Sequence, residues 1–266
     1  MITQHFEATL LAMGQILYRA IAKKPEEWLD LSIRMQSRPL YRESMIHAAG
    51  QYRTNEVQAA LPAFPCESQI MLRDMASQTV ANVKHVAGML VSHIPPELQR
   101  NPSTGLADQH QNSYSSYSKD IYGWMALTIF RQWLGHQLVQ DATHNAADLG
   151  FDFIMALKSG TSIKPGTAYL SEADLKAWHE KGFPMSAKSC SSLEDKVSAL
   201  KRTAWQIVSH LFPNHSKLEV ERYGAEYFTC EVPAPGRYPW QRVGEEEESA
   251  EEYSDEDMEE EEGDEA

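Results

Sequence analysis

Histidine and acidic side chains that lie close together in the sequence are the first candidates for chemistry. His136, Asp141 and His144 fall within one short stretch, and imidazole and carboxylate groups suit zinc or iron. Steps of five and three residues do not place all three side chains on one helical face, unlike the spacing of a zinc-protease motif. We therefore expect no metal site and no bound cofactor.

Cys190 is the cysteine with the most suggestive surroundings, because Ser189, Ser191 and Ser192 flank it. A nearby helix start could lower the pKa of its thiol and leave it reactive. A catalytic cysteine also needs a histidine that activates it, and the sequence positions none there. The GxSxG nucleophile motif and the phosphate-binding loops GxxxxGK(S/T) and GxGxxG are absent. We interpret Cys190 as a small residue before a helix and expect no catalytic residue in the chain.

Two further sets of polar residues are interpreted as structural. Asp148 and Asp152 are four residues apart and could share a proton if both were buried, but we expect them to face solvent near Lys158. His47 is expected to hydrogen-bond a neighbouring carbonyl or carboxylate where two helices meet. Neither set predicts a reaction.

Two arginines are expected to join helices rather than to capture anions. Arg34 is expected to pair with Glu43, and Arg131 with Asp120. Such inter-helix ion pairs would hold neighbouring helices in register.

Two tryptophans could in principle stack on nucleic-acid bases. Trp124 and Trp133 have Ile, Leu and Phe neighbours at helical spacing, which favours packing in the core. We therefore predict that Trp124 is a core residue and that its replacement by alanine is strongly destabilising.

The strongest charge feature is an acidic tail. Residues 244–266 hold 15 Asp and Glu and no Lys or Arg, whereas the rest of the chain holds the other 23 of its 38 acids against 24 Lys and Arg. The near-neutral body lacks the basic balance of a nucleic-acid-binding protein. The tail should be disordered and could attract basic proteins such as histones. Ser249 and Ser254 each precede an acid by three residues, so both are possible phosphorylation sites.

Cysteine usage and hydropathy indicate the compartment. The three cysteines are Cys66, Cys190 and Cys230, an odd number without paired spacing, which is typical of a reducing environment. We find no signal peptide and no stretch of eighteen uncharged apolar residues. We expect the chain in the cytoplasm or the nucleus, with no membrane contact.

The periodicity of apolar residues predicts a mainly α-helical, compact body with one small β-hairpin near its C-terminal end. The hairpin is expected over 217–232, around Tyr223-Gly224. Ser171 with Asp174 and Ser191 with Glu194 resemble capping boxes. The expected helices cover 3–23, 25–37, 39–51, 66–94, 119–141, 144–158, 172–181 and 192–211.

Composition divides the chain into four parts. We predict an N-terminal helical subregion over 1–94 and a C-terminal helical subregion with the hairpin over 118–243. Between them, residues 95–117 are rich in Pro, Gln, Asn, Ser and Gly and are interpreted as a polar linker. The acidic tail, 244–266, completes the chain.

Several blocks of the sequence carry a family resemblance. They are a Trp-Leu helix, an Arg-Ser step and a Glu-to-His stretch, an aromatic helix, and two tyrosine-rich ends, which are residues 28–34, 37–47, 50–52, 117–127, 130–133, 227–230 and 238–240. Together these blocks resemble fungal BTB/POZ-related proteins. It implies the helical region that follows a BTB fold, used for protein association and adaptor work in ubiquitin ligation or transcription. The sequence has no counterpart of the BTB fold itself, so no dimer or cullin contact is carried over to any residue.

We therefore expect a non-catalytic protein–protein interaction or adaptor module. Two alternatives stay open. One is a small helical enzyme without a linear motif, which would need a polar pocket that includes His47, Asp120 or His136. The other is a chromatin-associated chaperone that uses its acidic tail.

Overall fold

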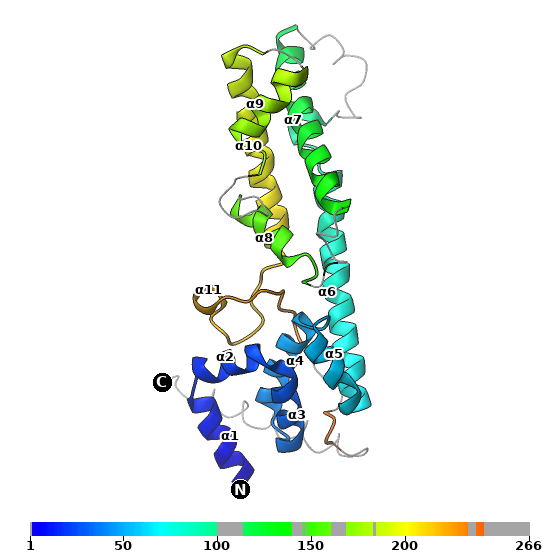
Figure 1. The fold of residues 1–266 in the computed structure, drawn as a ribbon, viewed down its shortest axis with the longest axis vertical. Coiled ribbons are helices and arrows are strands. Elements are labelled where there is room, and N and C mark those ends of the chain that lie inside the picture. The colour runs from blue at the N-terminus through cyan, green and yellow to red at the C-terminus, as the bar shows by residue number, and fades with distance from the viewer. Residues whose placement is uncertain are drawn as a thin grey trace, which may run out of the picture.

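The computed structural model describes residues 2–99, 114–139, 146, 148–160, 169–182, 185–233 and 238–241. In these residues the regular structure is helical and no strand is present, which confirms the prediction of a mainly α-helical body. None of the helices in these ranges is long and apolar enough to cross a membrane. The elements, shown in Figure 1, are α1 (Ile2–Ala12), α2 (Gln15–Lys23), α3 (Pro25–Met35), α4 (Arg38–Gly50), α5 (Asn55–Ala60), η1 (Leu61–Ala63), α6 (Cys66–Ser92), η2 (Pro96–Leu98), α7 (Tyr114–Val139), α8 (Phe151–Ser159), α9 (Glu172–Gly182), α10 (Ala187–Ser209) and α11 (Val220–Tyr223).

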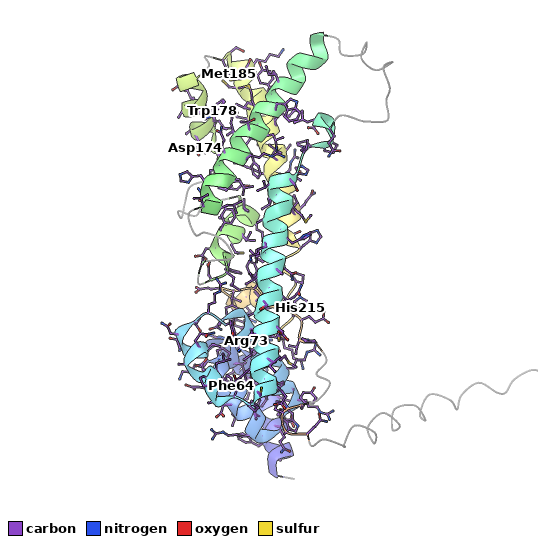
Figure 2. The ribbon with its side chains drawn as sticks, turned by 90° about the vertical axis from the view of Figure 1, so that its right-hand side faces the viewer. Phe64, Arg73, Asp174, Trp178, Met185 and His215 are labelled. Atoms are coloured by element: carbon purple, nitrogen blue, oxygen red, sulfur yellow. The ribbon has the colours of Figure 1, made fainter. Side chains whose placement is uncertain are left out.

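The long helix α6 runs along most of the molecule (Figures 1 and 2). Its 27 residues extend about 40 Å at 1.5 Å per residue. At one end, Leu72 and Met75 pack in a cluster with α3 and α4, which we call the lower core. At the other end, Val83, Val86 and Leu90 pack with α7, α8 and α10 in the upper core. One helix therefore contributes its buried stripe to both cores.

Local sequence signals explain several helix starts. At α9, Ser171 N donates to Asp174 Oδ2 at 2.8 Å and Asp174 N donates to Ser171 Oγ at 3.2 Å, as the predicted capping box requires. The second predicted box, Ser191 with Glu194, is wrong. Helix α10 begins earlier, where Ser186 Oγ accepts a backbone N–H of the first turn at 3.3 Å.

The predicted helix over 3–23 is divided into α1 and α2. Gly14 separates them with a φ of 55°, a left-handed backbone angle that glycine adopts without a steric penalty. The break changes the direction of the chain, so that Leu17 and Ile21 of α2 bury against Leu40 of α4. Apolar periodicity continued across the glycine and concealed this turn.

The predicted hairpin over 217–232 is not present. Residues 220–223 form the short helix α11, and residues 228–233 have no regular secondary structure and no partner strand in the described part of the chain. Phe228 packs in the upper core and Val232 in the lower core. The β-prone residues therefore pack individually against helices instead of pairing with one another.

The segment interpreted as a polar linker begins with an ordered turn. Leu98 of η2 is buried, and its side chain lies against Gly123 of α7. Residues 100–113 fall outside the described residues, and so do the acidic tail and its two serines, Ser249 and Ser254. The division into subregions therefore stays a prediction.

We predict that Gly50→Ala destabilises the fold by about 1 to 3 kcal/mol, because an added methyl group has no space. A Cβ atom at Gly50 would lie 2.7 Å from the carbonyl oxygen of Phe228 and would collide with the ring of Tyr227. Gly88→Ala, in the interior of α6, meets nothing within 4 Å and should stabilise by about 0.5 to 1 kcal/mol. Chemical denaturation of both variants tests this pair, and equal effects would contradict it.

Candidate interaction surface

Helix α7 presents two different apolar faces. Its inner face is buried against the upper core by Ala126, Leu127, Ile129, Phe130 and Leu134. At 100° per residue, these side chains occupy somewhat less than half of the helix circumference. The inner face accounts for the packing of α7, so the remaining apolar residues of this helix need another explanation.

The outer face of α7 carries large apolar side chains in solvent. Ile121 is 42% exposed, Trp124 45% and Val139 85%. The positions between them on the same face hold the exposed polar residues Thr128, Gln132 and His136. These six residues, which we call the α7 outer face, lie within about a third of the circumference and extend about 27 Å.

The α7 outer face contains no formal charge. Arg131 is the only Lys, Arg, Asp or Glu between residues 121 and 139, and it lies beside this face rather than on it. The exposed faces of neighbouring helices also carry large apolar side chains, such as Val91 on α6 and Trp205 on α10, but these faces are charged, with Arg73 and Lys84 on α6 and Asp195 and Arg202 on α10. Exposed apolar side chains gathered in an uncharged stripe are typical of a surface that binds another protein.

Trp124 is not a core residue, so this prediction is wrong. Trp133 provides the expected packing instead, with its ring stacked on Tyr169 at 4.5 Å between centroids. The two tryptophans are nine residues apart and so project from opposite sides of α7. Both helix faces are apolar in sequence, and periodicity alone could not decide which tryptophan is buried.

The predicted pair of Arg34 with Glu43 is not formed, and the predicted pair of Arg131 with Asp120 stays a prediction. Arg34 pairs with Asp30 at 2.8 Å within α3, and Glu43 has other partners. Arg131 Nη2 donates to the backbone carbonyl of His93 at 3.0 Å and so caps the C-terminal end of α6. The side chain of Asp120 lies outside the described residues.

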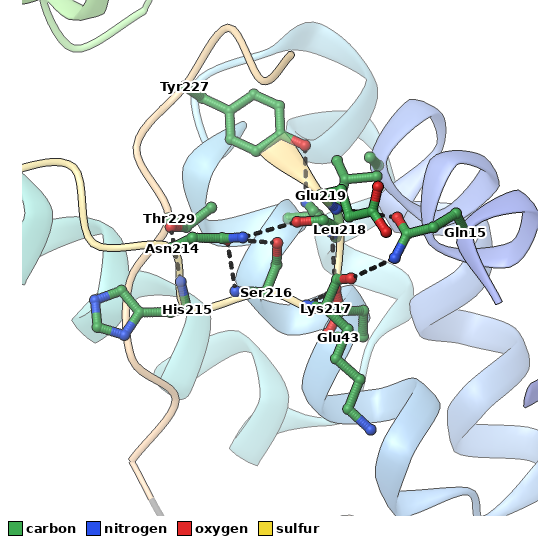
Figure 3. A network of polar contacts seen from close by, with 12 residues as sticks. Gln15, Glu43, Asn214, His215, Ser216, Lys217, Leu218, Glu219, Tyr227 and Thr229 are labelled. Atoms are coloured by element: carbon green, nitrogen blue, oxygen red, sulfur yellow. Dashed lines mark hydrogen bonds and ion pairs between the residues drawn. The ribbon is translucent and has the colours of Figure 1, made fainter. Parts of the chain in front are cut away.

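His47 hydrogen-bonds a neighbouring carboxylate, as predicted. Its ring is fully buried, with Nε2 at 3.2 Å from Glu43 Oε1 and Nδ1 at 2.8 Å from the Tyr227 hydroxyl. Glu43 Oε1 also accepts the backbone N–H of Lys217 at 2.8 Å. This arrangement, part of which is shown in Figure 3, fixes residues 217–227 to α4.

A side-chain amide from α2 holds the same segment. Gln15 Nε2 donates to the carbonyl of Lys217 at 2.9 Å, and Gln15 Oε1 accepts from Glu219 N at 3.0 Å (Figure 3). The amide thus bonds the backbone of residues 217–219 as a second chain would. Burial raises the pKa of the Tyr227 hydroxyl to about 12, so this phenol stays protonated at neutral pH. The network therefore holds residues 217–227 against α2 and α4.

The other candidate chemical residues are dispersed. Cys190 is half-buried in the first turn of α10 and forms no disulfide bond. Asp148 accepts the backbone N–H groups of Gly150 and Asp152 at 2.9 Å each and so starts α8. Lys158 lies over the ring of Phe212, with Nζ 4.2 Å from its centroid, rather than beside the two aspartates.

The three residues considered as metal ligands are not brought together in the described residues. His136 is exposed on α7, whereas Asp141 and His144 fall outside the described part of the chain. Within that part, no group of three or more His, Cys, Asp or Glu side chains could hold a metal ion.

Residues 95–210 match the family model of the FF domain, in its fungal form. The matched range runs from η2 through α10 and includes the whole α7 outer face. No curated protein and no solved structure matches the chain. The resemblance to BTB/POZ-related proteins is therefore wrong, because the family that matches is another one. Most of the blocks that suggested it lie in helices, and the residue types of packed helices are shared by unrelated helical proteins.

We predict opposite outcomes for the two tryptophans of α7. Trp133→Ala removes a ring stacked in the upper core and should cost about 3 kcal/mol of unfolding free energy. Trp124→Ala removes an exposed ring and should change it by less than about 0.5 kcal/mol. Urea denaturation measures both. A larger loss of unfolding free energy in the Trp124 variant than in the Trp133 variant would show that Trp124 is the buried residue.

We predict that Tyr227 makes the fold sensitive to alkali. The pKa of its hydroxyl is about 12 in the folded chain, against an ordinary value of 10.0, because burial penalises the phenolate. The free energy of unfolding that this pKa difference contributes is present in full below pH 10. It is lost as pH rises from 10 to 12, by up to about 3 kcal/mol.

Tyr227→Phe should therefore be less stable than the wild type at neutral pH, since it loses the hydrogen bond to His47. The difference between the two proteins should be constant from about pH 7 to 9 and should narrow above pH 10. Denaturation curves across this range measure it. A difference that stays constant to pH 12 would show that the phenol does not titrate differently in the folded state.

Proposed function

We propose that the chain is a non-catalytic protein-interaction module and that the α7 outer face binds its partner. The observation that carries the proposal is a stripe on α7 without Lys, Arg, Asp or Glu, on which the large apolar side chains of Ile121, Trp124 and Val139 are exposed. Its location supports this function, because FF domains are generally interaction modules and the stripe lies inside the matched range.

The shape and chemistry of the stripe indicate the kind of partner. Trp124 and Ile121 stand on a convex helix, so the partner must bring its own apolar groove or a second helix that packs beside α7. Tryptophan at the centre of an interface commonly provides a large share of the binding energy. The absence of charge favours an apolar contact over a salt-bridged one.

The absence of a catalytic role is also part of the proposal. Glu43 and His47 are the buried pair best suited to acid–base chemistry, and each hydrogen-bonds other groups of the protein. Their exposed fractions of 4% and 0% close them to a substrate. The alternative of a small helical enzyme would need these groups to line a cavity.

The acidic tail is proposed as a second, electrostatic contact for basic proteins in the cytoplasm or nucleus. The support is its charge, with 15 acids and no Lys or Arg over residues 244–266. Phosphorylation of Ser249 or Ser254 would strengthen such a contact. An adaptor or chromatin-chaperone role depends on which protein binds there.

A photo-crosslinking amino acid placed on two exposed faces tests the main proposal. At Thr128, within the α7 outer face, it should capture a discrete partner in cells, whereas at Ser198 on α10 it should not. Trp124→Asp in the Thr128 crosslinker background should abolish the capture and leave the melting temperature within a few degrees of the wild type. Equal capture from both positions, or capture that Trp124→Asp does not reduce, would contradict the proposal.

A further inference from the structure

A single segment without helix or strand assignment crosses from the upper core to the lower core. Phe228 and Val232 are buried, Thr229 and Cys230 are half-buried and Glu231 is exposed, and it is every second side chain, Phe228, Cys230 and Val232, that packs against the cores. Phe228 packs on Phe151 at 5.1 Å. The segment therefore has the side-chain pattern of a β-strand.

This segment lacks the partner that a strand requires. In the described residues, the backbone N–H and C=O groups of residues 229–232 make no hydrogen bond to another backbone group. The side chain of Thr229 is engaged, since its Oγ1 donates to the carbonyl of Pro213 at 3.0 Å and accepts from His215 N at 3.2 Å. Within the described residues, the main chain of this segment therefore has no backbone partner, and an extended peptide can add to a main chain of this kind.

A groove of about 530 Å³ lies beside this edge. Its apolar surface comes from Met75, Leu211 and Phe228, and the exposed side of α6 adds Gln78 and Asn82. His215 lies against α6 on this side of the molecule (Figure 2). The volume is in the usual range of ligand sites, which is about 300 to 1,000 Å³.

The charged residues that line the groove indicate which peptide sequence would bind there. Asp74 and Glu231 line it, and no Lys or Arg does. An added strand places alternate side chains on each face, so apolar residues would meet Met75 and Leu211 while basic residues would lie beside Glu231.

We propose that this groove binds an extended peptide of a partner protein, with alternating apolar and basic side chains, which pairs as a β-strand with residues 229–232. The site lies outside the matched FF range, except for the end of α10, and is separate from the α7 outer face. The groove would bind its peptide through main-chain hydrogen bonds, whereas the α7 outer face would bind its partner through apolar side chains.

A labelled hexapeptide of sequence KVKVKV, added to the full chain, tests this site. At saturation, the amides of residues 229–232 should exchange with solvent at least about tenfold more slowly. The same peptide with alternate amides N-methylated on the pairing edge keeps its charge but cannot pair, and should give no protection. This control also separates strand pairing from attraction of the lysines to the acidic tail.

Two variants of α6 test the location. Gln78→Trp should fill the groove and weaken binding of KVKVKV at least about tenfold, whereas Lys84→Trp, on the other side of α6, should leave it unchanged. Equal binding by both variants, or equal protection by the N-methylated peptide, would overturn the proposal. Protection that grows with protein concentration in the absence of peptide would also overturn it, in favour of pairing between two copies of the chain.

Discussion

The structure depends on one helix that belongs to two cores. The buried stripe of α6 places Leu72 and Met75 in the lower core and Val83, Val86 and Leu90 in the upper core. Because α6 is a continuous helix of 27 residues, the distance and orientation between the two cores are fixed by its backbone hydrogen bonds. A break in the middle of α6 would separate two cores rather than weaken one.

The C-terminal segment is the second link between the cores, and it is held in a different way. Phe228 and Val232, only four residues apart, bury in different cores, while Glu43 and His47 bind the preceding segment through Lys217 and Tyr227. A buried carboxylate is stable here because two donors satisfy the same oxygen. Polar contacts therefore position this segment, and apolar side chains anchor its end.

Sequence information was sufficient where contacts are local. The stripe predicted for the helix over 66–94 is buried as expected, and the Ser171–Asp174 box is formed. Sequence information was insufficient where the interaction partner is distant in the chain. His47 and Tyr227 are 180 residues apart, so only the kind of hydrogen bond could be predicted for His47, not the tyrosine.

On α7, two apolar faces made Trp124 and Trp133 equivalent in sequence, and the fold alone distinguishes them. The β-prone composition of residues 217–232 led to the prediction of a hairpin that is not formed, because composition does not specify whether two segments pair with each other or pack against helices.

The placement of charge makes the three proposed contacts distinguishable by salt. The α7 outer face carries no charge, so a contact there should change little with ionic strength. The groove beside residues 229–232 contains Asp74 and Glu231, and a contact there combines main-chain hydrogen bonds with partly screened charges. The tail has 15 acids over residues 244–266, and its contacts should weaken most steeply as salt is added. At physiological salt the field of the tail is largely screened beyond about 8 Å, so a contact farther from it than this gains little from its charge. A partner that binds unchanged in high salt must therefore use the α7 outer face.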